Sequence, residues 1–454
     1  MRFKARLMTA WEAIWSSYWF VPGMMVVAAI ALTFVTTAID RFVYDEWQRE
    51  AGWLATSSSD GARAMLTTIA ASMIGTAGVV FSITMVTLTL AANQFGSRML
   101  RNFMRDRSNQ AVLGTFLAAF TYCLLILRNV YGDNGGTDVQ PFIPQVGIIV
   151  AILSALAGVG VLIFFIHHVS MSIQAPNVVA SVNRELQRAI DSLYPMRVGS
   201  PPSDHERNVK PIIEQIPPAF ETAAAEIEAN RTGHVQRVEP EQLLALAAAH
   251  DLIVRIEHRP GQFVEKGDTM LSVYPQAHLD ADLRSRLQAT FVIGRERSLT
   301  QDIEFPVTQL VEVAVRALSP GINAPTTARL CLDQLGASLG QLAERQFPSP
   351  YRMDAENRLR VLAPSPSLCD FMDATFDEIR QNSERNLAVL IWMLEVFRRL
   401  ARHLPDEAAR AHLARHARMV NDQAKQIATT EHDLRRVAQA SAAVSSALNL
   451  PQIQ

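Results

Sequence analysis

Four apolar stretches in the N-terminal part of the chain reach the length of a membrane-spanning helix, which is roughly 20 residues. They cover about residues 18–39, 65–92, 111–130 and 144–166. None of them contains Asp, Glu or Lys, and Arg128, near the end of the third, is their only arginine. Charge is costly inside a bilayer, whereas an arginine at a helix end can extend to the interface. The pattern therefore predicts four transmembrane helices.

The second stretch carries many hydroxyl and amide groups on one helical face. A helix brings residues three or four apart onto one stripe, and this stripe comprises Ser72, Gly75, Ser82, Thr89 and Asn93. Two interpretations stay open. Small and hydroxyl side chains let neighbouring helices pack closely in lipid, and the same face could line a water-filled path in an oligomer. The stripe is therefore a candidate face for helix packing or for a pore.

Small residues also recur in the fourth stretch, at spacings that let two helix backbones approach each other. These residues are Gly147, Ala151, Ser154, Ala155 and Gly158. We therefore expect the fourth stretch to pack closely against other helices. Just past it, His167 and His168 are expected to anchor the helix at the interface. No span has an acidic or basic group at its centre, which argues against a proton-coupled carrier.

The positions of Lys and Arg around these stretches predict the orientation in the membrane. Basic residues precede the first stretch and follow the second, where the cluster comprises Arg98, Arg101, Arg105 and Arg107. These segments should therefore face the cytoplasm, and with four spans both termini lie on that side. The same four arginines are a candidate entrance for anions at the cytoplasmic mouth, unless they only obey the positive-inside rule.

Beyond about residue 175 the chain becomes more polar, and its pattern predicts a linker and then a β-module. Residues 176–230 contain a helix that leaves the membrane and a proline-rich linker. Residues 231–300 alternate in the manner of β-strands, with Gly261 and Gly267 at turns that suit positive φ. The turn resembles that of small β-barrels that carry lipoyl or biotinyl groups, but no lysine follows it at the modified position. We therefore expect a plain structural β-module.

Residues 301–454 have apolar positions at helical spacing and predict a helical domain. Near its start, Pro320 and Gly321 should end one helix and Asn323 should cap the next, which accounts for a sharp corner without a ligand. In a functional alternative, this region binds an anion through Arg295, Arg297, Asp302 and Arg316. Further on, an apolar stripe from Leu413 to Leu434 repeats every seven residues, which predicts one amphipathic helix.

Composition narrows the functional classes. Of 454 residues, 49% are hydrophobic and 19% are charged, and the formal net charge is −2. This balance does not favour nucleic acid as a partner, because nucleic-acid binding requires a cluster of basic residues on one face. Three cysteines without CxxC spacing predict neither a disulfide framework nor a zinc site. The chain has no P-loop, HExxH or GxGxxG motif. We therefore expect no catalytic, cofactor or metal site and no enzymatic activity, and an enzyme that modifies lipids ranks last among the functional hypotheses.

Four collinear segments together resemble one known family. They are residues 75–116, 164–175, 259–268 and 317–336, and they look like the bacterial membrane proteins grouped as domain of unknown function 2254. The resemblance covers nearly the whole chain. Because this family has no agreed activity, the resemblance implies a membrane location and carries over no cofactor or catalytic residue.

These observations together predict a mainly α membrane protein, with four transmembrane helices in residues 1–175 and a cytoplasmic α+β region after them. We expect a multi-pass protein of the bacterial inner membrane, in contact with membrane lipid, with its N- and C-termini in the cytoplasm. The leading functional hypothesis is a channel-like homo-oligomer with the polar face of the second helix at its axis. The alternative is a non-conducting scaffold or sensor whose cytoplasmic domain binds a partner protein.

Overall fold

The chain forms two compact units, Met1–Asn177 and Val178–Gln454. We call the first the helical bundle and the second the C-terminal unit. A computed structural model describes residues 18–50, 58–96, 106–131, 142–194 and 213–449, without the side chains of 43–50.

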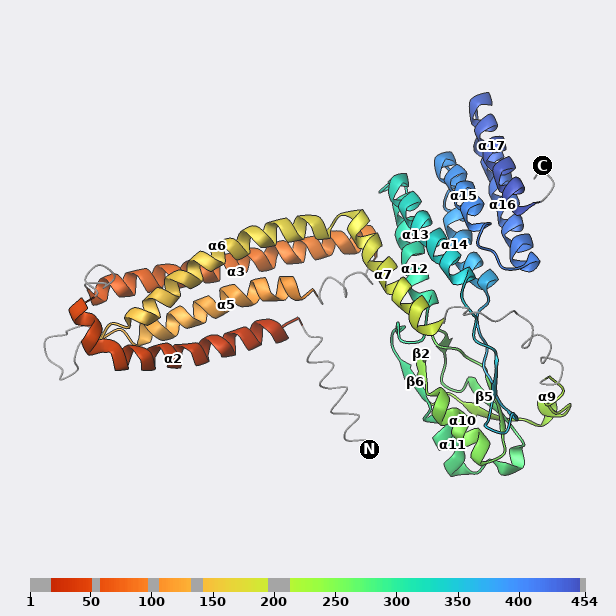
Figure 1. Ribbon diagram of the computed structural model, residues 1–454, viewed down its shortest axis with the longest axis horizontal. Helices are drawn as coiled ribbons and strands as arrows, with labels where there is room; N and C mark the ends of the chain where they lie inside the picture. The colour runs from red at the N-terminus through yellow and green to blue at the C-terminus, as the bar shows by residue number, and fades with distance from the viewer. Residues whose placement is uncertain (1–17, 51–57, 97–105, 132–141, 195–212, 450–454) are drawn as a thin grey trace. The chain divides into compact units, whose positions relative to one another are not determined.

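Four long helices make up the described part of the helical bundle, and Figure 1 shows them side by side. They are α2 (Phe20–Glu50), α3 (Ser59–Phe95), α5 (Arg107–Arg128) and α6 (Gln145–Ser172). Each is long and apolar enough to cross a membrane, which confirms the four predicted apolar helices. The helices α2 and α6 continue past the apolar stretches, because hydropathy marks the segment suited to lipid and a helix ends only where its backbone hydrogen bonding stops.

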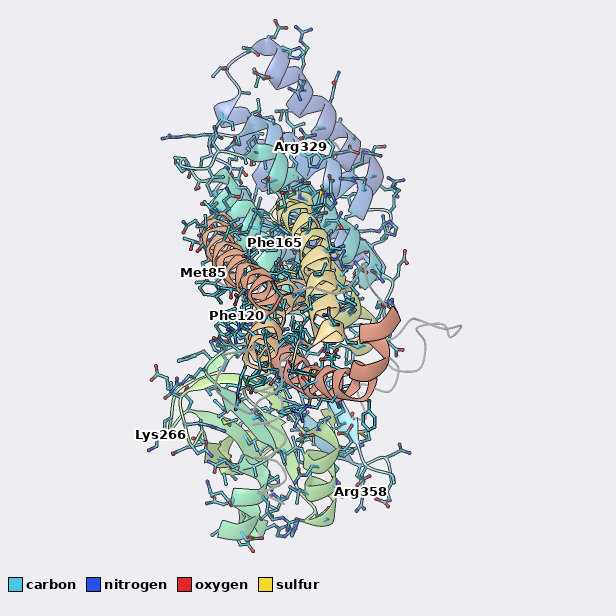
Figure 2. All side chains as sticks on the ribbon, turned by 90° about the vertical axis from the view of Figure 1, so that its left-hand side faces the viewer. Met85, Phe120, Phe165, Lys266, Arg329 and Arg358 are labelled. Carbon is cyan, nitrogen blue, oxygen red and sulfur yellow. The ribbon has the colours of Figure 1, made fainter. Side chains whose placement is uncertain are left out.

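The helix α5 lies at the centre of the bundle, in contact with α2, α3 and α6. Its side chains Phe116, Tyr122 and Ile126 are buried in two adjoining apolar clusters. Phe165 of α6 is also fully buried, whereas Met85 of α3 is 45% exposed (Figure 2). The apolar core is therefore built around α5, and α3 presents one side to the surroundings.

A buried carboxylate joins α2 to the start of α6. The residue before α6 is Pro144, which has no side-chain group to cap the helix. Instead, Asp40 of α2 accepts hydrogen bonds from the backbone N–H groups of Val146 at 2.8 Å and Gly147 at 3.0 Å. Asp40 is only 5% exposed. It therefore belongs to the bundle, although the charge pattern places it beyond the end of the first apolar stretch.

Two small sheets form one part of the described C-terminal unit. One has the strand order β1 (Ala225–Glu228), β5 (Thr269–Tyr274), β3 (Ile253–Ile256), β8 (Leu359–Leu362) and β7 (Tyr351–Met353). The other has the order β4 (Phe263–Val264), β2 (Gly233–Val238) and β6 (Phe291–Gly294). The short helices here are α9 (Phe220–Ala223), α10 (Pro240–Ala249), the 3-10 turn η1 (Gln276–His278) and α11 (Ala281–Gln288).

The five-stranded sheet draws strands from both sides of the range predicted for the β-module. The strand β1 precedes residue 231, and the hairpin β7–β8 comes from the segment predicted to be helical. The strand β8 joins because it pairs in parallel with β3, with Val254 opposite Val361. A pairing partner so far along the chain cannot be found from local alternation. The positive φ expected at the turn glycines is confirmed, at +95° for Gly261 and +101° for Gly267.

Helices make up the rest of the C-terminal unit. Among the described residues they are α7 (Ala175–Leu193), which begins at the end of the helical bundle, α12 (Glu304–Leu318), α13 (Pro325–Ala343), α14 (Leu368–Gln381), α15 (Leu387–Leu400), α16 (Glu407–Ile427) and α17 (Glu431–Leu448). Polar contacts attach α7 to α13. The amide of Asn183 donates to Gln334 at 2.6 Å, and that of Gln187 donates to Ser338 at 2.9 Å.

Two details of the helical prediction are wrong. At the corner after α12, the residue that precedes α13 is Ala324, and Asn323 adopts a left-handed φ of 46° instead of capping. The seven-residue stripe is interrupted, because α16 ends at Ile427 and α17 begins at Glu431, so that Leu434 belongs to a second helix and is 44% exposed. A periodic pattern can continue by chance across a short break.

Candidate functional site

The polar stripe predicted on the second helix lies on the outer side of α3. All five of its residues are exposed: Ser72, Gly75, Ser82, Thr89 and Asn93. The buried side of α3 includes Met73, Ala77, Val80, Thr84 and Thr87, and helical periodicity places these residues on the opposite side. Within the described part of the bundle, the stripe therefore lies on the exposed side of α3 and not in the packed core.

The hydroxyl groups of this outer face are satisfied by the backbone of α3 itself. The Oγ of Ser72 donates to the carbonyl of Thr68 at 2.8 Å, and that of Ser82 donates to Gly78 at 2.8 Å. The hydroxyl of Thr89 donates to Met85 at 2.9 Å. Each hydroxyl keeps free lone pairs after this bond. These three hydroxyls thus present no unpaired O–H donor to lipid, and they retain acceptors for water or for another helix.

The glycines of α3 and α6 differ in what surrounds them. A Cβ added at Gly158 of α6 would lie 3.3 Å from the sulfur of Met73, and one at Gly147 would lie 2.9 Å from Ile126. The packing role predicted for small residues of the fourth stretch is confirmed at these two positions. A Cβ added at Gly75 or Gly78 of α3 meets nothing within 4 Å. The small outer face of α3 is open.

Three arginines of the candidate anion entrance lie outside the described residues: Arg98, Arg101 and Arg105. The fourth, Arg107, is exposed at the start of α5. Next to it, Asp106 caps α5 by accepting from the N–H of Ser108 at 2.9 Å, and its other oxygen lies 2.6 Å from Nε2 of His168. This end of the bundle therefore carries a carboxylate as well as a basic group, and His168 has a specific partner there.

The residues considered for anion binding near the α12–α13 corner are largely paired with carboxylates. Arg297 donates to both oxygens of Asp302, at 2.7 and 2.9 Å, and Asp302 also accepts from the N–H of Phe305 at 3.2 Å. Arg316 forms an ion pair with Glu312 at 3.1 Å. The Asp302 contacts stabilise the start of α12, and the Glu312–Arg316 pair lies within that helix. These contacts support a structural role for Arg297, Asp302 and Arg316.

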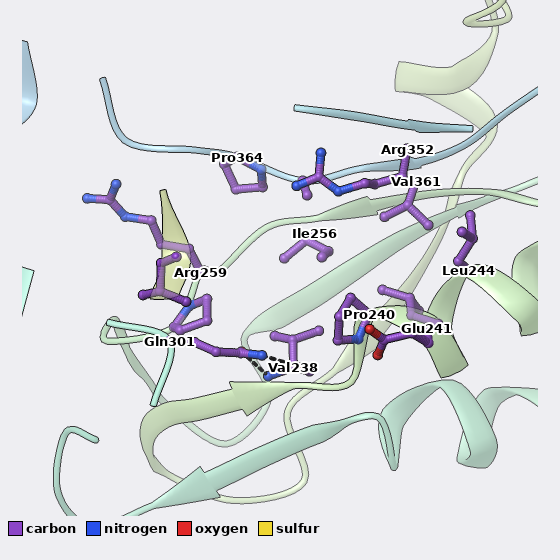
Figure 3. A pocket seen from close by; sticks show the side chains of 14 residues that line it. Val238, Pro240, Glu241, Leu244, Ile256, Arg259, Gln301, Arg352, Val361 and Pro364 are labelled. Carbon is purple, nitrogen blue, oxygen red and sulfur yellow. Dashed lines mark hydrogen bonds between the residues drawn. The ribbon is translucent and has the colours of Figure 1, made fainter. Parts of the chain in front are cut away.

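A cleft of about 490 Å³ opens between the β-strands and α10 of the C-terminal unit (Figure 3). A volume of this size suits a small or medium-sized ligand. Much of its lining is apolar and includes Val238, Leu243, Leu244, Ile256 and Val361. On one side, Gln301 is held in place by two 2.9 Å hydrogen bonds with the backbone of Val238. The cleft is therefore preformed and mainly apolar.

Two arginines give the cleft its positive groups. Arg259 is paired with Glu304 at 2.6 Å. Arg352 donates to the carbonyl of Ser349, and among the described residues it has no carboxylate partner. Burial lowers the pKa of Arg352, although a guanidinium stays protonated at neutral pH. The arrangement offers an unpaired, partly buried cation beside an apolar surface.

Four residues outside every predicted site come together between α14 and α16. The helix α14 supplies Asp373 and Asp377, and α16 supplies His412 and His416. Within each pair the spacing is i, i+4, which places both members on one helical face, and this spacing is the signal in the sequence that identifies them. Burial lowers the pKa of His416. Burial acts to raise the pKa of Asp373, but hydrogen bonds from the two histidines outweigh it and leave that pKa low.

One of the comparisons with known proteins identifies a family of predicted membrane proteins. A family model described as predicted membrane protein (DUF2254) matches residues 15–399. Uncharacterised proteins of Mycobacterium bovis and Mycobacterium tuberculosis are each 30% identical to the chain over 394 residues, which is 86% of this chain and 73% of the mycobacterial protein. No solved structure matches the chain. The range of the family model contains the four long helices and the cleft, and it ends before α16.

Proposed function

Because the chain belongs to the family of predicted membrane proteins grouped as domain of unknown function 2254, we propose that it is a multi-pass protein of the bacterial inner membrane that forms a channel-like homo-oligomer. In this assembly the outer face of α3 lines the axis. One observation supports the proposal most. Gly147 and Gly158 of α6 lie against side chains of the same chain, whereas Gly75 and Gly78 of α3 meet nothing within 4 Å and lie beside an exposed row of hydroxyls.

The physical argument rests on how helices associate in lipid. Lipid tails are as apolar as leucine, so helices there are held by close packing and by polar contacts, which small and hydroxyl residues provide. An open face of this kind on α3 suits a second copy of the chain. Around an axis, the spare acceptors of Ser72, Ser82 and Thr89 would face water, and Arg107 would lie at the entrance and favour anions.

A pair of matched glycine substitutions tests the assembly. Gly75→Leu on α3 and Gly160→Leu on α6 both add a side chain where nothing lies within 4 Å. We expect Gly75→Leu to dissociate the oligomer in mild detergent, measured by light scattering, and Gly160→Leu to leave it intact. In planar bilayers, wild type should pass current and Ser82→Leu should reduce it. A monomeric wild type, or equal effects of the two glycine variants, would contradict the proposal.

The cleft favours a second candidate function, a non-conducting scaffold or sensor. An unpaired Arg352 beside an apolar lining suits an acidic group carried on an apolar segment, in a partner protein or in a smaller molecule. The same bilayer experiment separates the two candidates. An intact oligomer that carries no current, with wild type and Ser82→Leu alike, would favour the sensor and eliminate the channel.

A further inference from the structure

Three side chains of α14 and α16 direct metal-binding atoms at one point. The Nε2 atoms of His412 and His416 each lie 2.8 Å from the same oxygen, Oδ1 of Asp373. All three ligand atoms lie within 4.8 Å of one another. In a tetrahedral zinc site, ligand atoms about 2.0–2.1 Å from the ion are about 3.3 Å apart. Each histidine nitrogen thus needs to move away from Oδ1 of Asp373 by only about 0.5 Å to reach that spacing.

A single carboxylate oxygen collects several polar contacts in this cluster. Oδ1 of Asp373 has three donors within 2.9 Å, namely the two histidines and Nη2 of Arg415. The same Nη2 lies 3.2 Å from Nε2 of His412. Because both nitrogens can donate to Asp373, their 3.2 Å separation is a contact between two neighbouring donors. An ion at the centre would accept lone pairs from all three ligand atoms.

A second carboxylate lies behind the buried histidine. His416 is fully buried, and its Nδ1 has no hydrogen-bond partner among the described residues. The nearest carboxylate oxygen is Oδ1 of Asp377, at 3.8 Å, the distance of a long ion pair. Metal-bound histidines usually direct their other ring nitrogen at a carboxylate, which sets the tautomer and raises the basicity of the ligand. Asp377 is positioned for this role.

We propose that Asp373, His412 and His416 bind a divalent transition-metal ion of the zinc type, with Asp377 supporting His416 and with one coordination position left for water. Two imidazoles and one carboxylate are a common protein ligand set for such ions. The ion would connect α14 to α16, two helices that lie apart in the sequence on either side of α15. Its binding would therefore stabilise the helical part of the C-terminal unit.

Arg415 controls access to this site. Its guanidinium lies beside Asp373 and His412, where its charge opposes a cation, and its side chain is 54% exposed. It can therefore turn toward solvent when the ion enters. The position of Arg415 therefore predicts how a substitution there changes the affinity for zinc. The Arg415→Gln substitution removes this positive charge and should tighten zinc binding by about tenfold or more. A neighbouring charge shifts the binding of a proton by a similar factor, and zinc is also a cation.

The test uses the full-length protein in detergent, without a polyhistidine tag, and measures Zn²⁺ affinity by competition with a chromophoric chelator. We expect one specific site per chain. His412→Gln and Asp373→Asn should each weaken it by more than about 100-fold, a larger loss than that of an outer-sphere partner. His416 is left intact because it packs against Phe376 and Phe397, and its removal would disturb the core.

The control is another histidine that pairs with a carboxylate but, among the described residues, belongs to no group of three possible metal ligands. His403 lies 2.7 Å from Glu344 in the same unit, and His403→Gln should leave Zn²⁺ affinity unchanged. Co²⁺ in the wild-type site should also give the visible absorption of a tetrahedral complex. Equal affinities of wild type, His412→Gln and His403→Gln would overturn the proposal, as would a weaker affinity in Arg415→Gln.

Discussion

At the scale of single residues, the role of a charged side chain depends on its hydrogen-bond and ion-pair partners. Arg360 is 3% exposed and could have suggested a binding site. Instead, its Nε donates to Asp354 and its guanidinium terminus donates to Asp251, both at 2.7 Å. The hydrogen bond from Arg360 holds the pKa of Asp251 below its usual value. Burial acts to raise the pKa of Asp354, but the bonds from Arg360 and from the backbone of Arg358 outweigh it and leave that pKa low.

This cluster predicts how the stability of the C-terminal unit depends on pH. An unfolded aspartate has a pKa of about 3.9, so as the pH falls the unfolded chain takes up protons before the folded one does. The stabilisation is therefore present above about pH 4 and is lost as the pH falls through the lowered folded values. We expect Asp354→Asn to lower the free energy of unfolding at neutral pH. We also expect this free energy to fall less steeply with decreasing pH in the variant than in the wild type. The urea midpoint, measured by circular dichroism between about pH 6 and about pH 3, checks this. An unchanged acid slope would contradict it.

At the scale of elements, α6 shows that a helix start can depend on another helix. Pro144 leaves the first N–H groups of α6 without a local cap, and Asp40 of α2 accepts from two of them. A carboxylate there is stabilised both by the hydrogen bonds and by the helix dipole. The same contact fixes α2 against α6. It therefore contributes to the tertiary structure of the bundle as well as to one helix.

We expect Asp40→Ala to destabilise the bundle by about 2 kcal/mol, the upper range for loss of a helix cap. Unfolding of the detergent-solubilised protein by increasing proportions of denaturing detergent measures this. Asp60→Ala is the matched control, because Asp60 lies exposed in the first turn of α3, where Ser58 provides the cap. Its effect should be no more than about 0.5 kcal/mol. Equal losses in the two variants would show that Asp40 acts only through its charge near a helix end.

At the scale of the whole molecule, the distribution of arginines predicts the topology. Basic clusters flank the N-terminus and the segment between α3 and α5, and four spans return the chain to the starting side. We therefore expect a fluorescent reporter that matures only in the cytoplasm to be active when fused at the C-terminus. A reporter active only in the periplasm should be inactive at that position and active when inserted between α5 and α6. The opposite pattern would reverse the orientation and move the C-terminal unit outside.

Periodicity and composition were sufficient for part of this structure. Four apolar helices, the polar stripe on the second of them, and the turn glycines of the β-module all follow from local rules about lipid, helical spacing and backbone conformation. These rules depend only on neighbours in the chain. The i, i+4 pairs on α14 and α16 were also visible, but neither pair is distinctive alone.

Only the tertiary structure decided which groups meet. Asp373 and His412 lie 39 residues apart in the chain and are in contact. Asp40 caps a helix that begins 105 residues later, and β8 pairs with β3 although Val254 and Val361 lie about 107 residues apart in the chain. The direction of the α3 stripe was likewise undetermined until α5 and α6 covered the other side. Local sequence sets which faces a helix has, but contacts between distant segments depend on the packing of the whole chain, and that packing determines which face stays open and which side chains converge.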